Sequence, residues 1–78
     1  MIPIKDFLNK IKWDKNENHS DYSIGYWDNQ NKKLIFIKFE EIRKIEENFI
    51  LLDREEETYI PLHRIKIVKR NEEVVWKR

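Results

Sequence analysis

The sequence contains no cysteine, only one glycine and two prolines in 78 residues. The absence of cysteine excludes a disulfide framework and any metal site built from thiolates. No apolar run approaches the roughly 20 residues that a membrane-spanning helix needs. The first residues also lack the pattern of a signal peptide. We therefore expect a soluble, cytoplasmic protein that does not act at a membrane.

The chain is close to the lower size limit at which a single hydrophobic core suffices. No repeat, low-complexity tract or linker divides it, so residues 1–78 are predicted to form a single domain. A cleft between domains is excluded in so short a chain. Any functional site should be a surface or a shallow pocket.

Charge is abundant but unevenly distributed. The formal net charge is only +1, although 40% of the residues are charged. Residues 40–57 contain eight acidic and three basic residues, whereas residues 62–78 contain six basic and two acidic ones. This separation allows a local basic face that could meet an anionic partner. Alternatively, the acidic middle and the basic end attract one another within the fold.

The first half of the chain alternates between helical and extended patterns. Residues 3–12 predict a helix, because apolar residues recur there with the spacing of one helix face. Residues 15–20 form a polar loop. Strands are predicted at 21–27 and 33–39, with a turn between them at 28–31. The second strand is apolar on both faces, which favours a central position in a sheet.

Two residues of the first strand need a specific explanation. Gly25 is the only glycine and lies in the middle of the strand, which indicates a β-bulge or the close approach of another group. Tyr26 and Trp27 point to opposite faces, and we expect Trp27 to be the exposed one.

The middle of the chain is predicted to form short elements. Residues 40–45 indicate a single helical turn with Ile42 and Ile45 facing inward. A short strand at 49–52, an acidic turn at 53–57 and a returning strand from residue 58 follow. Pro61 should interrupt that strand, because proline has no N–H to donate.

Residues 62–78 predict a β-hairpin with its turn at Asn71-Glu72. This turn would pair Lys69 with Val74, Val68 with Val75 and Ile67 with Trp76. The two predicted faces follow from strand alternation: a core face of Ile65, Ile67, Val74 and Trp76, and a basic face of Arg64, Lys66, Arg70 and Lys77. The expected fold is α+β, a curved, barrel-like antiparallel sheet of about five strands with one N-terminal helix.

The residues needed for catalysis are not evident. The two histidines invite comparison with phosphoesterases in which each histidine is followed two residues later by Ser or Thr. The runs His19-Ser20-Asp21 and His63-Arg64-Ile65 do not fit that pattern. His19 lies in a polar loop where little would fix its orientation, and residues 53–57 suit a solvated turn better than a metal site. We predict a binding protein with no catalytic residues, no metal and no cofactor.

Anion binding is better supported. His63 is expected at the rim of the core, partly buried and held in one orientation. Arg64 can present its planar fork to two phosphate oxygens, and Lys66 and Arg70 would add positive charge. Adjacent strand residues point to opposite faces, so His63 and Arg64 converge only if the chain bends after Pro61. The alternative is a structural His63 and an Arg64 that pairs with the acidic middle.

Four segments in order resemble the RNA cyclic group end recognition domain family. They are residues 7–14 (FLNKIKWD), 21–28 (DYSIGYWD), 60–65 (IPLHRI) and 74–76 (VVW). The family is common in archaea and otherwise uncharacterised. The resemblance covers nearly the whole chain, and the best-matching positions are Trp13, Asp14, Tyr22, Tyr26, Asp28, His63, Arg64 and Trp76.

The resemblance implies recognition of RNA 3′ ends that carry a 2′,3′-cyclic phosphate, in RNA processing or repair and alongside RNA-processing enzymes. It makes His63 and Arg64 the contacts to the phosphate. Asp14 and Asp28 would either bind ribose hydroxyls or tie loops to backbone N–H groups. Exposed rings, Tyr26 or Trp27, would stack on unpaired bases. Two alternatives stay open: a protein-interaction module that uses residues 40–57 or a sheet edge, and an RNA phosphodiesterase. The oligomeric state is not predicted.

Overall fold

The computed structural model describes residues 2–78, which form one α-helix, three short 3₁₀ helices and seven strands. In chain order the elements are α1 (Ile4–Trp13), η1 (His19–Asp21), β1 (Tyr22–Asp28), β2 (Lys33–Lys38), η2 (Phe39–Glu41), β3 (Ile42–Ile45), β4 (Phe49–Leu52), β5 (Thr58–Pro61), η3 (Leu62–Arg64), β6 (Ile65–Arg70) and β7 (Glu73–Lys77). The predicted helix is confirmed to within one residue at each end. The α+β class is also confirmed.

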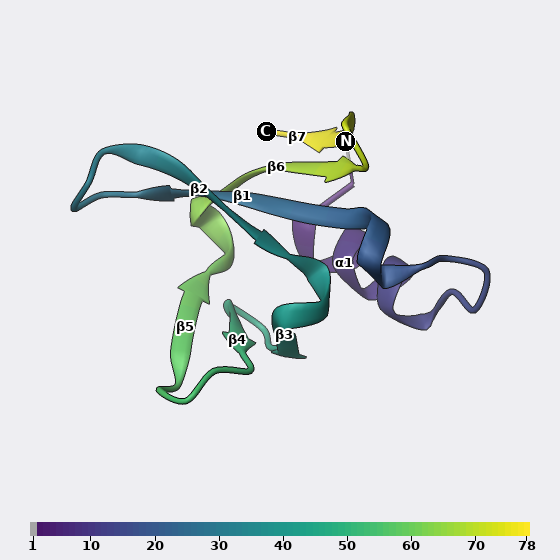
Figure 1. The fold of residues 1–78 in the computed structure, drawn as a ribbon, viewed down its shortest axis with the longest axis horizontal. Coiled ribbons are helices and arrows are strands. Elements are labelled where there is room, and N and C mark those ends of the chain that lie inside the picture. The colour runs from purple at the N-terminus through teal and green to yellow at the C-terminus, as the bar shows by residue number, and fades with distance from the viewer. Residues whose placement is uncertain (1) are drawn as a thin grey trace.

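The strands form two antiparallel sheets rather than the single barrel-like sheet of about five strands that was predicted. One sheet has the order β2-β1-β6-β7, and the other has the order β3-β4-β5. Neither order closes on itself. The chain leaves the four-stranded sheet through η2, forms the three-stranded meander and returns through η3 (Figure 1). Each 3₁₀ turn redirects the backbone, which separates the two sheets.

One hydrophobic core joins the helix to both sheets. The buried residues of α1 are Ile4, Leu8 and Ile11, which lie one or two helix turns apart on one face. Their partners include Tyr22, Ile24, Val68 and Trp76 from the four-stranded sheet and Ile50, Leu52 and Ile60 from the three-stranded sheet. No polar or charged side chain is fully buried among residues 2–78. Packing of apolar side chains is therefore the main source of stability.

The helical turn predicted at residues 40–45 was partly wrong. The 3₁₀ helix η2 covers Phe39–Glu41, and the strand β3 begins at Ile42. Ile42 and Ile45 both pack against the core, as predicted. Three residues apart, they would face opposite ways in a regular strand, but the register shifts between Ile42 and Lys44. A β-bulge thus reproduces the inward spacing that suggested a helix.

The prediction of a central strand at residues 33–39 was wrong. β2 lies at the edge of the four-stranded sheet and pairs only with β1. Its two apolar faces are also unequal, because Ile37 is buried whereas Leu34 and Phe36 are exposed. The strand is apolar on both faces, but only the face of Ile37 is buried, and the face of Leu34 and Phe36 is exposed to solvent.

The register of the C-terminal hairpin is confirmed only near its turn. Lys69 pairs with Val74 as predicted, but a shift between Val68 and Lys69 then pairs Val68 with Trp76. The predicted pairs of Val68 with Val75 and of Ile67 with Trp76 were wrong. The extra residue in β7 turns Val74 outward and keeps Trp76 in the core. Strand parity alone cannot reveal such an insertion.

Gly25 allows side chains to pack closely over the sheet. A Cβ atom at this position would lie 2.6 Å from Cγ2 of Ile67 and 2.8 Å from Cε1 of Phe36. The register of β1 and β6 also shifts between Gly25 and Tyr26. Both predictions for the glycine are confirmed, since it sits at a bulge and at a close approach. The Phe36 ring edge occupies the space of the missing side chain.

We expect Gly25→Val to lower the melting temperature, because overpacking of this kind costs about 1–3 kcal/mol. Ser23→Val, on the same face of the same strand, is the matched control and should melt close to the unchanged protein. Circular dichroism melts measure both. Adding Phe36→Ala to the Gly25→Val variant should restore part of the loss. Equal melting temperatures for the two valine variants would contradict this packing.

Candidate functional site

His63 lies in η3, between the last strand of one sheet and the third strand of the other. Pro61 ends β5, and the Leu62 N–H donates to the Asn48 carbonyl at 2.9 Å. Leu62 is buried and anchors the turn, whereas His63 is exposed. The prediction of a partly buried His63 at the core rim was therefore wrong. Successive residues of a 3₁₀ helix point about 120° apart, and here the leucine takes the inward direction.

The His63 side chain opens onto a hollow of about 1110 Å³. The hollow is open to solvent and bordered by the N-terminal segment, the β4–β5 region and the end of β7. Its lining residues are Ile2, Pro3, Ile4, Lys5, Glu47, Asn48, Phe49, Tyr59, Pro61, Leu62, His63, Trp76 and Arg78. The rings of Phe49 and Tyr59 meet edge to face, 4.9 Å apart, on one wall. Its walls are therefore mainly apolar, with a few polar groups among them. That is the usual composition of a small-molecule site.

Two cations, Lys5 and Arg78, share this hollow with His63, and Arg78 is the one held by the backbone. Its Nε donates to the Ile65 carbonyl at 3.1 Å, and its Nη2 donates to the Leu62 carbonyl at 3.2 Å. The guanidinium carbon lies 5.4 Å from the centre of the Trp76 ring. A guanidinium carries five N–H groups, so these two bonds fix its position and leave the others for a ligand. Sequence reasoning missed this residue, although Arg78 shares the strand parity of the core residue Trp76.

Arg64 does not join His63 at the hollow. It is not among the lining residues, and its Nε is buried without a hydrogen-bond partner in the protein. The predicted meeting of the His63 and Arg64 side chains was therefore wrong. The bend after Pro61 exists, but in a 3₁₀ turn it separates neighbouring side chains. The guanidinium that lines the same hollow as His63 comes from Arg78 instead, thirteen residues beyond Ile65 along the hairpin.

Lys66 and Arg70 are also separated. The Lys66 Nζ lies 3.4 Å from the His63 carbonyl, close to the hollow but outside its lining. Arg70 lies at the far end of β6, where its Nε is 3.9 Å from the Glu17 carboxylate. A carboxylate partner makes Arg70 a poorer phosphate ligand than a free arginine. None of the three ion pairs within residues 2–78 joins segment 40–57 to segment 62–78, so mutual neutralisation of those segments is not supported.

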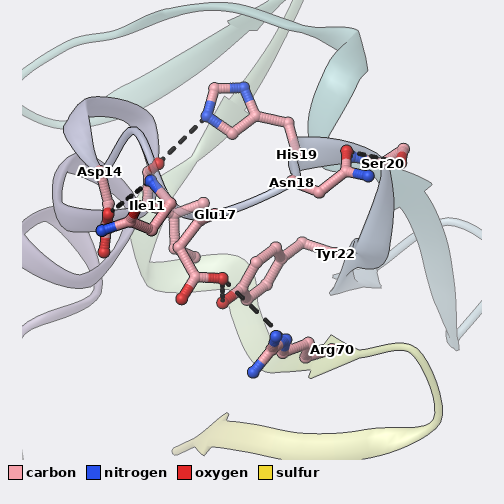
Figure 2. Close-up of polar contacts among 9 residues, drawn as sticks. Ile11, Asp14, Glu17, Asn18, His19, Ser20, Tyr22 and Arg70 are labelled. Carbon is pink, nitrogen blue, oxygen red and sulfur yellow. Dashed lines mark hydrogen bonds and ion pairs between the residues drawn. The ribbon is translucent and has the colours of Figure 1, made fainter.

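Arg70 belongs to a second, smaller cluster around the loop after α1 (Figure 2). The Tyr22 hydroxyl donates to Glu17 at 2.7 Å, and Glu17 faces Arg70. These side chains and Asp14 line a hollow of about 160 Å³. The Asp14 carboxylate accepts the Asn16 N–H at 2.9 Å, which fixes the start of the loop. The cluster ties the loop to β1 and β6.

His19 is held in the same region, contrary to the expectation that little would fix it. Its Nε2 donates to the Ile11 carbonyl at 3.1 Å, as Figure 2 shows. Its ring also lies 4.9 Å from the Phe39 ring. Asn18 caps η1 by accepting from the backbone and the hydroxyl of Ser20. His19 therefore supports the fold and lies outside the hollow that contains His63.

The other predicted site residues lie on β1. Asp28 accepts from the Gln30 N–H at 2.9 Å and from the Asn31 side chain at 2.9 Å. The hydrogen bond from the Asn31 side chain is the main cause that lowers the Asp28 pKa. Its carboxylate ties the turn to backbone N–H groups, one of the two roles expected for it. Tyr26 packs against the core, and Trp27 is exposed at 37%, as predicted.

Within the described part of the chain, no cluster of three or more His, Asp or Glu side chains could hold a metal ion. No helix in residues 2–78 has the length and apolar character needed to cross a bilayer.

The Tyr22 phenol should make the free energy of unfolding depend on pH. Burial, together with the hydrogen bond to Glu17, raises the pKa of Tyr22 to about 12, from about 10 in an unfolded chain. The neutral phenol therefore contributes stability that is present below about pH 10 and is lost as the pH rises toward 12. We expect the free energy of unfolding in urea to fall less between pH 8 and 11 in Tyr22→Phe. Tyr26→Phe is the control, and identical pH dependence in both variants would contradict the assignment.

The comparisons with known proteins cover the whole chain. The family described as the MJ1316 RNA cyclic group end recognition domain matches residues 1–78. A UPF0248 protein of Saccharolobus islandicus (strain L.S.2.15) is 38% identical over 80 residues, covering 99% of this chain and 100% of that protein. A UPF0248 protein of Saccharolobus solfataricus is 35% identical over 80 residues, with 99% and 98% coverage.

A third relative, from Metallosphaera sedula, is also a UPF0248 protein, 35% identical over 77 residues and covering 99% of this chain and 94% of its own length. No solved structure matches the chain. The family match extends from the helix to the last strand and includes both hollows. The chain belongs to the MJ1316 RNA cyclic group end recognition domain family.

Proposed function

We propose that this protein binds RNA ends that carry a 2′,3′-cyclic phosphate and does not cleave them. The observation that carries the proposal is the shared hollow of His63 and Arg78, which offers an exposed imidazole and an anchored guanidinium between apolar walls. The family description points to the same ligand. The natural setting for this activity is RNA processing or repair, beside the enzymes that make or consume such ends.

The donors at the hollow suit a small anion. Arg78 is fixed by its bonds to Leu62 and Ile65, so little conformational entropy is lost when its remaining N–H groups meet a ligand. Charge-assisted hydrogen bonds from a guanidinium to phosphate oxygens are among the strongest in proteins. The Lys5 ammonium at the same hollow already pairs with Glu47. Arg78 and His63 are therefore the groups best placed to hold a phosphate.

The apolar walls favour the cyclic ester over an open phosphate. A cyclic phosphodiester carries a single negative charge, whereas a phosphate monoester carries roughly −1.5 to −2 at pH 7. Removing the more highly charged group from water costs more. The hollow is also large enough for a nucleoside, since pockets for small molecules are typically about 300–1,000 Å³. Tyr59, exposed at 53% on its wall, offers a ring for the terminal base.

Binding without cleavage is supported by the separation of the two histidines. His19 donates to a backbone carbonyl beside α1, so His63 has no second imidazole in its hollow. Cleavage of a cyclic phosphate requires a general base for water and a general acid for the leaving oxygen. The lining provides one carboxylate, Glu47, and it is paired with Lys5.

The test compares three short RNAs of one sequence, ending in a cyclic phosphate, a 3′-phosphate or a hydroxyl. Fluorescence anisotropy at fixed salt should give the highest affinity for the cyclic end. Because hydrogen bonds to charged groups are worth about 1.5–3 kcal/mol, Arg78→Lys and His63→Ala should each lose about 10- to 100-fold of that affinity. Chromatography of the recovered RNA should show an unchanged cyclic end.

Arg43→Ala is the matched control, because Arg43 is an exposed arginine on β3 outside both hollows. It removes one positive charge and should leave the preference for the cyclic end intact. Thermal melts establish that each variant is folded. Equal affinity for all three ends in the unchanged protein would refute end recognition, and hydrolysis of the cyclic end would refute the non-catalytic assignment.

A further inference from the structure

The four-stranded sheet has one face against the core and one face in solvent. We call the second one the outer sheet face. The strand registers place on it Ser23, Gly25, Trp27, Leu34, Phe36, Lys38, Ile67, Lys69, Val74 and Lys77. Four of its large apolar side chains, Trp27, Leu34, Phe36 and Val74, are exposed. This face is separate from the hollow, because none of its residues lines that hollow.

The Phe36 side chain on this face is held in place. The Phe36 ring reaches over Gly25, where its edge fills the space of the missing side chain, yet 46% of the residue stays exposed. Trp27 pairs with Leu34, and Gly25 pairs with Phe36, so Trp27 and Phe36 are diagonal neighbours on adjacent strands. A ring that is fixed and exposed can stack on a base with little loss of conformational entropy.

The charges on this face have one sign. Lys69 places its Nζ 5.0 Å from the centre of the Phe36 ring, and Lys38 and Lys77 lie on the flanking strands β2 and β7. Among the paired positions of this face, all within residues 2–78, none is acidic. An apolar protein partner would have to bury these ammonium groups without carboxylates supplied from this side. A polyanion with flat apolar groups fits them better.

We infer that the outer sheet face binds unpaired nucleotides of RNA, with bases stacked on Phe36 and Trp27 and phosphates beside Lys38, Lys69 and Lys77. This inference rests on the proposed function, since it concerns the body of the RNA whose end occupies the hollow. The ligand must be unpaired RNA, because the faces of paired bases are stacked inside a duplex and cannot contact protein rings. Stacking on aromatic rings next to cations is a general mode of single-strand binding.

The experiment separates this face from the end site by varying RNA length at a constant cyclic end. Phe36→Ala should weaken anisotropy-measured binding of an octanucleotide by about 5- to 100-fold, the range for losing one stacked base. Binding of a dinucleotide with the same end, and the preference for the cyclic end over a hydroxyl, should not change. Phe36→Leu, which keeps an apolar side chain and removes the ring, should give the same loss if Phe36→Ala proves unstable.

Trp13→Ala is the matched control, because Trp13 is exposed at 75% on α1, away from the sheet. It should leave octanucleotide binding unchanged. An octanucleotide with abasic sites keeps the phosphates but loses the stacking on both Phe36 and Trp27, so its affinity for the unchanged protein should fall at least as far as that of intact RNA for the Phe36→Ala variant. Lys38→Gln with Lys69→Gln should lower the salt slope of log affinity by about 1.4, because each phosphate that is no longer neutralised on a single strand reduces that slope by about 0.7.

Two results would overturn the inference. One is equal octanucleotide affinity for Phe36→Ala and Trp13→Ala. The other is a concentration-dependent dimer in sedimentation that Phe36→Ala abolishes and RNA does not dissociate, which would assign the face to a second copy of the chain. If the unchanged protein showed no preference for the cyclic end but Phe36→Ala still weakened octanucleotide binding, the proposed function would be refuted and RNA binding by this face would remain supported.

Discussion

Trp76 links the core, the N-terminal segment and the wall of the hollow. Its ring is buried in the core opposite Val68, and its Nε1 donates to the Ile2 carbonyl at 2.9 Å. That bond joins Ile2, the first described residue, to the last strand β7, next to the C-terminus in Figure 1. The same ring faces the Arg78 guanidinium and forms part of the wall of the hollow. Packing and site geometry therefore rest on one side chain.

Two β-bulges decide which side chains reach the two candidate surfaces. The shift between Val68 and Lys69 puts Trp76 in the core and turns Val74 to the outer face. The shift between Gly25 and Tyr26 places Ile67 beside Gly25, where it packs with Phe36. A bulge bends a strand and changes the side to which later residues point. In so small a protein, such local irregularities determine both the core and the two candidate surfaces.

The two candidate surfaces have different physical characters. The hollow is an open, mainly apolar depression with one anchored guanidinium, which suits a single chemical group. The outer sheet face is open and basic, which suits an extended chain of repeating charge and flat bases. The acidic segment 40–57 lies mainly in the other sheet and pairs internally through Glu41 and Arg54. The acidic segment 40–57 thus contributes strands to the three-stranded sheet, and the basic segment 62–78 contributes strands to the four-stranded sheet.

Patterns between near neighbours in the chain were readable from the sequence. Helix spacing gave α1, and the Asn71-Glu72 turn gave the pair of Lys69 with Val74. Strand alternation placed Tyr26 and Trp27 on opposite faces, and Trp27 is the exposed one, as expected. Predictions failed where they assumed that regular strand alternation continues through a β-bulge or a 3₁₀ turn. The hairpin register beyond Val68 and the burial of His63 are the two cases, because a bulge or a 3₁₀ turn shifts the direction of every later side chain.

The residue types alone determined a small α+β fold without thiol chemistry and with a basic C-terminal segment. Only the tertiary structure decided that Asp28 holds its own turn, that Arg78 rather than Arg64 lines the hollow with His63, and that β2 is an edge strand with its aromatic ring uncovered. These outcomes depend on contacts between segments far apart in the chain. Sequence periodicity describes the direction of a side chain relative to its own element, and carries no information about what lies opposite.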